Sequence, residues 1–222
     1  MSTGAGGSGA NTSEALNGVL EEARTLGFLG PGPVAPQLAH AVAFLDLLEV
    51  EAGAAGPFLD LGSGGGIPGL VLACVLTDSR WVLLDSMIRR TRFLEEAVER
   101  LDLGGRVEVI TARAETFGRD AAHRMRYRGI VARSFAAPPV LAECAAPLLQ
   151  RGGTVVVSEP PAEGGDSGPR PGRWDDAALA SLGLSVDRWE AGPPAFVRLR
   201  QAGRCPRTYP RAVGVPAASP LW

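Results

Sequence analysis

A glycine-rich segment between two acidic residues is the part of this sequence best suited to bind a ligand. Asp60 precedes Gly62-Ser63-Gly64-Gly65-Gly66, and Asp85 follows Gly62 by 23 residues. Glycines let a backbone approach a ligand closely, and free amides at the start of a helix bind anionic or polar groups. A carboxylate such as Asp85, at the end of the next strand, can accept both hydroxyls of a ribose. The spacing therefore predicts a nucleoside site.

The glycines alone do not decide which nucleoside binds. Residues 64–69 also match the G-x-G-x-x-G pattern of dinucleotide sites, so a nicotinamide-dependent oxidoreductase is one hypothesis. Asp60 favours a cationic ligand instead, since a carboxylate beside the loop attracts the sulfonium and ammonium of S-adenosylmethionine. Two predicted helices before the first strand also differ from many dinucleotide domains. S-adenosylmethionine is thus the preferred cofactor.

Short apolar runs alternate with amphipathic stretches from Pro57 onward, which predicts an α/β fold with a mostly parallel sheet. Ligands of such sheets bind beyond the carboxyl ends of the strands, where the strand order reverses. We predict strands at 57–61, 81–85, 106–110, 128–132, 153–158, 185–190 and 195–200. We predict helices between Ser13 and Gly27 and at 35–52, 67–77, 86–103, 114–124, 138–150 and 174–182.

Composition divides the chain into four parts. The Gly/Ser-rich residues 1–13 are expected to be a disordered lead, and residues 14–54 an N-terminal helical segment. Residues 55–200 form the predicted Rossmann-like domain, which contains a Gly/Pro-rich loop at 160–173. Residues 201–222 are expected to be a basic tail.

The 222 residues are 45% hydrophobic and 21% charged, which excludes a disordered or fibrous chain. No apolar run approaches the roughly 20 residues of a membrane span, so we expect no membrane association. Cys74, Cys144 and Cys205 show no paired spacing, so we expect no metal site, no disulfide framework and a cytoplasmic location.

All 22 basic residues are arginines, although the net charge is −2. The stretch 196–222 holds five arginines and no acid, and a second basic run extends from Arg119 to Arg133. Local basic strips on an acidic protein suit contacts with RNA phosphates, while pairing with nearby acids is the alternative interpretation.

Several segments together resemble the RsmG (GidB) family of bacterial 16S rRNA methyltransferases. They are FLDLGSGGGIPGLVL at 58–72, LLDSMIRRTRFL at 83–94, ARAETF at 112–117, RSFA at 133–136 and YPRAVGVP at 209–216. The resemblance implies a class I S-adenosylmethionine-dependent methyltransferase fold with seven strands, acting on N7 of a guanine in 16S rRNA or the small ribosomal subunit. The family's cofactor contacts then fall on Gly62 and Ile67 in the loop, on Ala114 and Glu115, and on Arg133. To these we add Ser63 and Gly64 of the same loop, and Asp85 on the physical grounds given above.

Methylation of guanine N7 needs no general base, because the N7 lone pair is already available. The enzyme has to align N7 with the donor methyl group about 3 Å away and exclude water. Arg133 is the candidate catalytic residue, with O6 of guanine, a phosphate or the cofactor carboxylate as its partner; an ion pair with Asp60 is the alternative. Phe135 is expected to pack rather than stack on a base, and His40 to be a core residue. We expect a monomer.

Departures from the family pattern leave other hypotheses open. Ser158-Glu159-Pro160 stands where many members have a lysine-glycine pair, and alanines occupy 217 and 218 where basic residues are expected. These differences allow a methyltransferase of the same fold that acts on a small molecule or another RNA. A nucleoside-binding protein without turnover is a further alternative.

Overall fold

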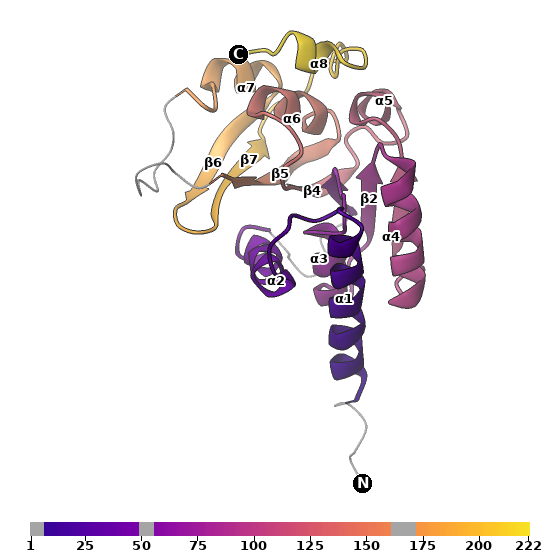
Figure 1. Cartoon of the computed structure of the whole chain (residues 1–222). Coiled ribbons are helices and arrows are strands. Elements are labelled where there is room, and N and C mark those ends of the chain that lie inside the picture. The colour runs from indigo at the N-terminus through magenta and orange to yellow at the C-terminus, as the bar shows by residue number, and fades with distance from the viewer. Residues whose placement is uncertain (1–6, 49–55, 161–171) are drawn as a thin grey trace.

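The computed structural model describes residues 7–48, 56–160 and 172–222. Its centre is a seven-stranded sheet in the order β3-β2-β1-β4-β5-β7-β6 (Figure 1). Strands β1 to β5 are parallel, and β7 lies antiparallel between β5 and β6. The bounds are β1 Phe58–Leu61, β2 Trp81–Asp85, β3 Val107–Thr111, β4 Tyr127–Ala132, β5 Leu149–Glu159, β6 Leu184–Glu190 and β7 Ala195–Gln201.

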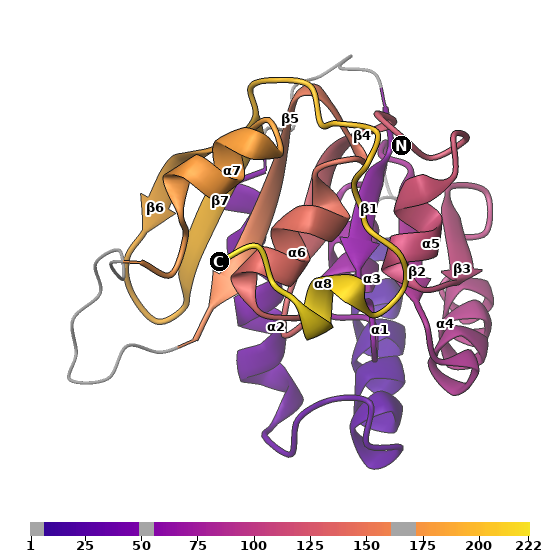
Figure 2. The same cartoon turned by 90° about the horizontal axis from the view of Figure 1, so that it is seen from above.

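Helices cover both faces of the sheet (Figure 2). One core lies between the sheet and α1 to α4, and the other lies between the sheet and α5 to α7. Side chains alternate along β1, so Phe58 belongs to the first core while Leu59 and Leu61 belong to the second. The bounds are α1 Gly7–Thr25, α2 Val34–Val42, the 3₁₀ helix η1 Ala43–Asp46, α3 Gly69–Val75, α4 Ile88–Arg100, α5 Ala114–Arg119, α6 Pro138–Ala145, α7 Asp176–Ser181 and α8 Val215–Ala218.

The predicted α/β class and all seven strands are confirmed, but several boundaries differ. Helix α1 begins at Gly7, so residues 7–13 of the expected disordered lead are helical, while residues 1–6 lie outside the described part. Strand β5 begins at Leu149 rather than 153, because Pro147 has no N–H to continue α6 and the chain enters the sheet early. The predicted loop at 160–173 falls largely on residues 161–171, which are also outside the described part.

The predicted helix at 35–52 is shorter and changes type. It is α-helical to Val42 and continues as η1 to Asp46, while residues 49–55 are not described. The expected tail at 201–222 is more ordered than predicted, since it contains α8 and packs against α6. None of the helices in the described ranges is both long and apolar enough to cross a membrane.

Candidate active site

The glycine loop connects β1 to α3 and packs against the end of β2. The amides of Gly62 and Ser63 both donate to the carbonyl of Leu84, at 2.9 and 3.0 Å. Gly62 has φ +83°, and a Cβ at this position would lie 2.7 Å from the Phe135 ring. The loop therefore needs glycine here for both its backbone angle and its contact with Phe135.

Asp60 supports this loop from inside the protein. It is fully buried, and its Oδ2 accepts a hydrogen bond from the Gly69 amide at 2.9 Å, at the start of α3. Burial raises the pKa of Asp60 to about 7, against the opposing hydrogen bond from the Gly69 amide. The prediction that Asp60 faces a cationic cofactor is wrong, because its carboxylate lies under α3 and is bound to Gly69. Asp60 is not one of the described residues that line the cleft beside the loop.

Asp85 has the position expected of a ribose ligand. Its Oδ2 accepts from the Gly64 amide and its Oδ1 from the Met87 amide, both at 2.9 Å. These bonds fix the carboxylate between the glycine loop and the start of α4. Oδ2 also lies 3.5 Å from Nη1 of Arg90, so the remaining capacity for ribose hydroxyls lies mainly on Oδ1.

A cleft of about 250 Å³ opens beside the loop, at the carboxyl ends of β1 to β4. Below we call it the cofactor cleft. It contains four of the predicted cofactor residues: Gly62, Asp85, Ala114 and Glu115. The other predicted residues are not among the described residues that line it: Ser63, Gly64, Ile67 and Arg133. Ile67 packs into the core instead, and the Ser63 hydroxyl donates to the carbonyl of Asp60 at 3.1 Å.

Glu115 is held by two donors from different parts of the chain. Its Oε1 accepts from Nη2 of Arg113 at 2.9 Å and from the Gly214 amide at 3.1 Å. Burial opposes the ionised form, but these donors together hold the pKa of Glu115 below its usual value. Its carboxylate therefore has a structural role in addition to the predicted contact with adenine.

A second cavity of about 490 Å³ lies at the carboxyl ends of β4 and β5, and we call it the acceptor cavity. Arg133 lies here rather than in the cofactor cleft. Its Nη2 donates to Oε1 of Gln37 at 3.4 Å, and its buried Nη1 has no hydrogen-bond partner among the described residues. The alternative ion pair with Asp60 is therefore wrong, since the Asp60 carboxylate is bound to Gly69 instead.

His40 also lines the acceptor cavity, whereas the sequence predicts a core residue. Its Nε2 lies 2.8 Å from the Ser158 hydroxyl, and its ring contacts Phe44 and Phe196. Burial and the charge of Arg133 lower the pKa of His40 to about 4. The imidazole is thus neutral at physiological pH.

Three residues that line the acceptor cavity were not predicted from the sequence, namely Glu159, Arg173 and Trp174. Glu159 ends β5, and its carboxylate pairs with Arg173 and accepts from the Trp174 indole at 3.0 Å. Their only signal in the sequence is an acid at the end of a buried strand and a tryptophan after the Gly/Pro-rich loop.

The two cavities share the segment Ser134-Phe135-Ala136. Ser134 has φ +54°, a left-handed conformation that is uncommon for residues other than glycine. Phe135 packs on Gly62 and the second core, as expected. This segment therefore borders both cavities, and we call it the boundary segment.

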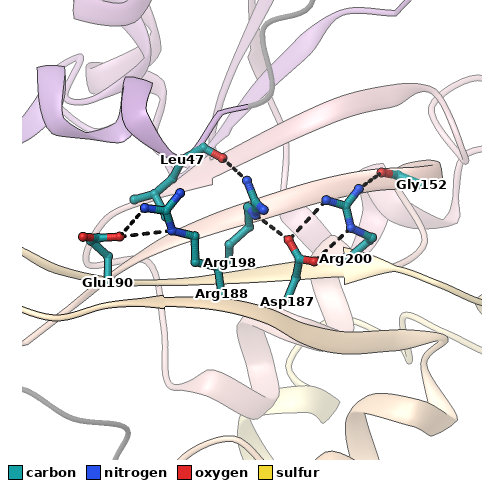
Figure 3. Close-up of polar contacts among 7 residues, drawn as sticks. All are labelled: Leu47, Gly152, Asp187, Arg188, Glu190, Arg198 and Arg200. Carbon is teal, nitrogen blue, oxygen red and sulfur yellow. Dashed lines mark hydrogen bonds and ion pairs between the residues drawn. The ribbon is translucent and has the colours of Figure 1, made fainter.

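Two arginines of the predicted basic stretch 196–222 lie on β7 and are paired with an acid (Figure 3). Arg198 and Arg200 point to the same face of the sheet and both contact Asp187, at 2.6 and 3.2 Å. Arg198 also donates to the carbonyl of Leu47 and Arg200 to that of Gly152, both at 3.1 Å. Here the alternative of pairing with nearby acids describes the structure better than a free phosphate-binding strip.

No group of metal-ligating side chains occurs in the parts of the chain that the structure describes. The sequence matches the family model "GidB: rRNA small subunit methyltransferase G" over residues 36–159. A relative named ribosomal RNA small subunit methyltransferase G from Rubrobacter xylanophilus is 42% identical over 76% of this chain and 66% of its own length. The protein of the same name from Synechococcus sp. (strain RCC307) is 36% identical over 73% of this chain and 70% of its own length.

Among solved structures, a SAM dependent methyltransferase from Aquifex aeolicus superposes with a TM-score of 0.58 at 18% identity, covering 82% of this chain and 97% of that one. This similarity confirms the predicted class I methyltransferase fold. The sequence matches favour methyl transfer over the oxidoreductase hypothesis. By its match over residues 36–159 and its relatives above 30% identity, the chain belongs to the GidB family of small-subunit rRNA methyltransferases.

Proposed function

We propose that this chain transfers a methyl group from S-adenosylmethionine to N7 of a guanine in the 16S rRNA of the small ribosomal subunit. The observation that carries the proposal is the pair of cavities that meet at Ser134-Phe135-Ala136. A methyl transferase needs a donor site and an acceptor site in contact, and both lie beyond the carboxyl ends of the strands. The enzyme works in the cytoplasm with its ribosomal substrate.

The cofactor binds in the cofactor cleft. Asp85 accepts the ribose hydroxyls, and the glycine loop lets the nucleoside approach the backbone at Gly62. Ala114 and Glu115 lie at the start of α5, where backbone amides can meet the adenine edge. When bound, S-adenosylmethionine supplies an electrophilic methyl group.

The guanine binds in the acceptor cavity. Nη1 of Arg133 is buried and finds no hydrogen-bond partner in the described part of the chain, and an unsatisfied buried donor costs roughly 1–3 kcal/mol. A bond from this atom to guanine O6 would remove that cost and orient the neighbouring N7 toward the boundary segment. We therefore assign Arg133 to the acceptor rather than to the cofactor.

The residues around the acceptor cavity suit a reaction without proton removal. His40 stays neutral because its pKa is about 4, and Glu159 is engaged with Arg173 and Trp174. Neither has to act as a base, since N7 reacts through its free lone pair. Orientation and exclusion of water are the contributions that remain.

Transfer of a tritiated methyl group tests the proposal. Small subunits and deproteinised 16S rRNA, both from a strain lacking the modification, are incubated with the protein and labelled S-adenosylmethionine. We expect label in one of the two substrates, recovered as 7-methylguanine after digestion. Label in another nucleoside would contradict the N7 assignment, and no label in either substrate would contradict the rRNA assignment.

Replacing Arg133 with alanine tests the orienting role. We expect turnover to fall by about 10²-fold while the affinity for S-adenosylhomocysteine stays the same. A variant with unchanged turnover would remove Arg133 from the site, and one with lower cofactor affinity would return it to the cofactor cleft.

A further inference from the structure

Residues 206–222, which we call the strap, run back over the helices of the second core. Figure 2 shows the segment passing α5, crossing α6 as α8 and ending near α7. Its arginines belong to the basic stretch 196–222, for which contacts with RNA phosphates and pairing with nearby acids are the two expectations. Its contacts indicate a different use.

The strongest attachment of the strap is an ion pair between Arg211 and Glu143 of α6. Glu143 has no exposed surface. Its Oε1 accepts from the backbone amide and Nε of Arg211 at 2.8 and 2.9 Å, and its Oε2 accepts from Nη2 at 2.6 Å. Nη2 also donates to the carbonyl of Ser219 at 2.8 Å, so the same arginine connects two parts of the strap. A buried carboxylate that lost this partner would be strongly destabilising.

Two further attachments hold the strap to α5 and to the loop before β4. The Gly214 amide donates to Glu115, which itself lines the cleft. Nη1 of Arg124 donates to the carbonyl of Tyr209 at 2.6 Å and to that of Gly118 at 2.9 Å. Gly214 has φ +82° and is the N-cap of α8, and this short helix brings Ala217 to the wall of the cofactor cleft.

The other end of the strap reaches the acceptor cavity. The Trp222 indole donates to the carbonyl of Arg173 at 3.1 Å. Arg173 and the adjacent Trp174 form the far wall of that cavity. One segment therefore supports walls of both cavities. Its residues Arg211 and Gly214 bind Glu143 and Glu115, which are 68 and 99 residues away in sequence.

We propose that the strap is part of the methyl-transfer site, with Glu143 and Arg211 as positioning residues that hold Ala217 against the bound cofactor. Trp222 positions the Arg173–Trp174 wall of the acceptor cavity in the same way. This inference rests on the proposed function, since it assigns S-adenosylmethionine to the cofactor cleft. Because coupling between two events is reciprocal, releasing the strap lowers cofactor affinity, and bound cofactor tightens the strap.

Calorimetric titration with S-adenosylhomocysteine tests the positioning role. We expect Glu143→Gln to raise Kd about tenfold, within the range typical of coupled sites. Asp187→Asn is the matched control, because it replaces another carboxylate paired with arginine, on the β6–β7 face away from the strap. Its Kd should equal that of the wild type.

The outcomes separate this inference from the proposed function. Wild-type protein that fails to bind S-adenosylhomocysteine would overturn the assignment of the cofactor itself. Wild-type binding with an equal Kd for Glu143→Gln would overturn only the role of the strap.

Two measurements keep the inference testable if Glu143→Gln does not fold. Ala217→Leu enlarges an exposed side chain on the cleft wall without touching the ion pair, and we expect a higher Kd with an unchanged Tm. Hydrogen exchange on the wild type should slow at the Arg211 and Gly214 amides when S-adenosylhomocysteine is added. An unchanged Kd in the first experiment, or unchanged exchange in the second, would contradict the proposal.

Trp222→Phe tests the acceptor side of the strap. The variant keeps an aromatic ring but loses the indole donor to Arg173. We expect a severalfold higher KM for RNA with the same kcat and the same Kd for S-adenosylhomocysteine. A normal KM would show that the wall holds without the strap.

Discussion

Asp60 shows how a single side chain can be assigned the wrong role from its neighbours in sequence. The residue precedes the glycine loop, which suggests contact with a cationic ligand. Along β1, however, side chains alternate, and Asp60 points to the same face as Phe58. There it meets α3, and Gly69 is the residue that makes room, because a Cβ at position 69 would lie 2.4 Å from that of Asp60.

The raised pKa of Asp60 makes the stability of the protein depend on pH. The carboxyl keeps its proton in the folded state up to about pH 7, whereas in the unfolded chain it ionises near 3.8. Between these two pH values the unfolded state thus binds fewer protons than the folded state. The contribution of Asp60 to stability is therefore fully present below pH 3.8 and is lost as the pH rises to 7.

Asp60→Asn removes this ionisation with little change in shape. We expect the variant to gain stability relative to the wild type from pH 4 to pH 7, by up to roughly 1.4 kcal/mol per pH unit. Urea unfolding of both proteins at several pH values measures the difference. Parallel stability profiles would show that the aspartate ionises normally.

His40 gives a second prediction for a single residue. Burial and Arg133 lower its pKa to about 4, so its ring should not change charge between pH 5.5 and 8. An NMR titration of the ring protons, assigned with His40→Gln, should give constant shifts over this range. A titration midpoint near 6.5 would mean that the acceptor cavity is more open to solvent than the structure indicates.

Among the secondary-structure elements, the start of α3 sets the shape of the glycine loop. The Gly69 amide binds Asp60, and the space beside Gly69 is filled by that carboxylate. This arrangement fixes where the loop leaves the sheet, and so where Gly62 meets the cofactor cleft.

Gly69→Ala should therefore disturb both folding and binding. We expect a loss of about 1–3 kcal/mol in the free energy of unfolding, typical of overpacking, and weaker binding of S-adenosylhomocysteine. Gly104→Ala is the control, since nothing lies within 4 Å of a Cβ at Gly104. Equal urea midpoints for the two variants would contradict this account of the helix start.

For the whole molecule, local patterns in the sequence predicted the architecture but not the long-range polar contacts. Alternating apolar runs located all seven strands, and the glycine loop with Asp85 located the cofactor cleft. The strap was misjudged because the partner of Arg211 is 68 residues away, and no periodicity connects them. The same holds for Arg133, whose partner Gln37 comes from the N-terminal helices, 96 residues away in sequence.

Cofactor binding should also be visible in the stability of the whole molecule. A ligand at 100 times its Kd stabilises the folded state by about 2.7 kcal/mol, which for a chain of this size raises Tm by roughly 5–10 °C. We expect this shift with S-adenosylhomocysteine and none with NAD at the same concentration. Stabilisation by NAD alone would revive the oxidoreductase hypothesis.

The shared boundary at Ser134-Phe135-Ala136 has a consequence for kinetics. Because the cavities that we propose for donor and acceptor share no other described lining residue, we expect that neither substrate has to bind before the other. Spent donor can be exchanged for fresh while the RNA stays in place. Steady-state rates measured against both substrates should then follow a random-order mechanism, in which either substrate can bind first.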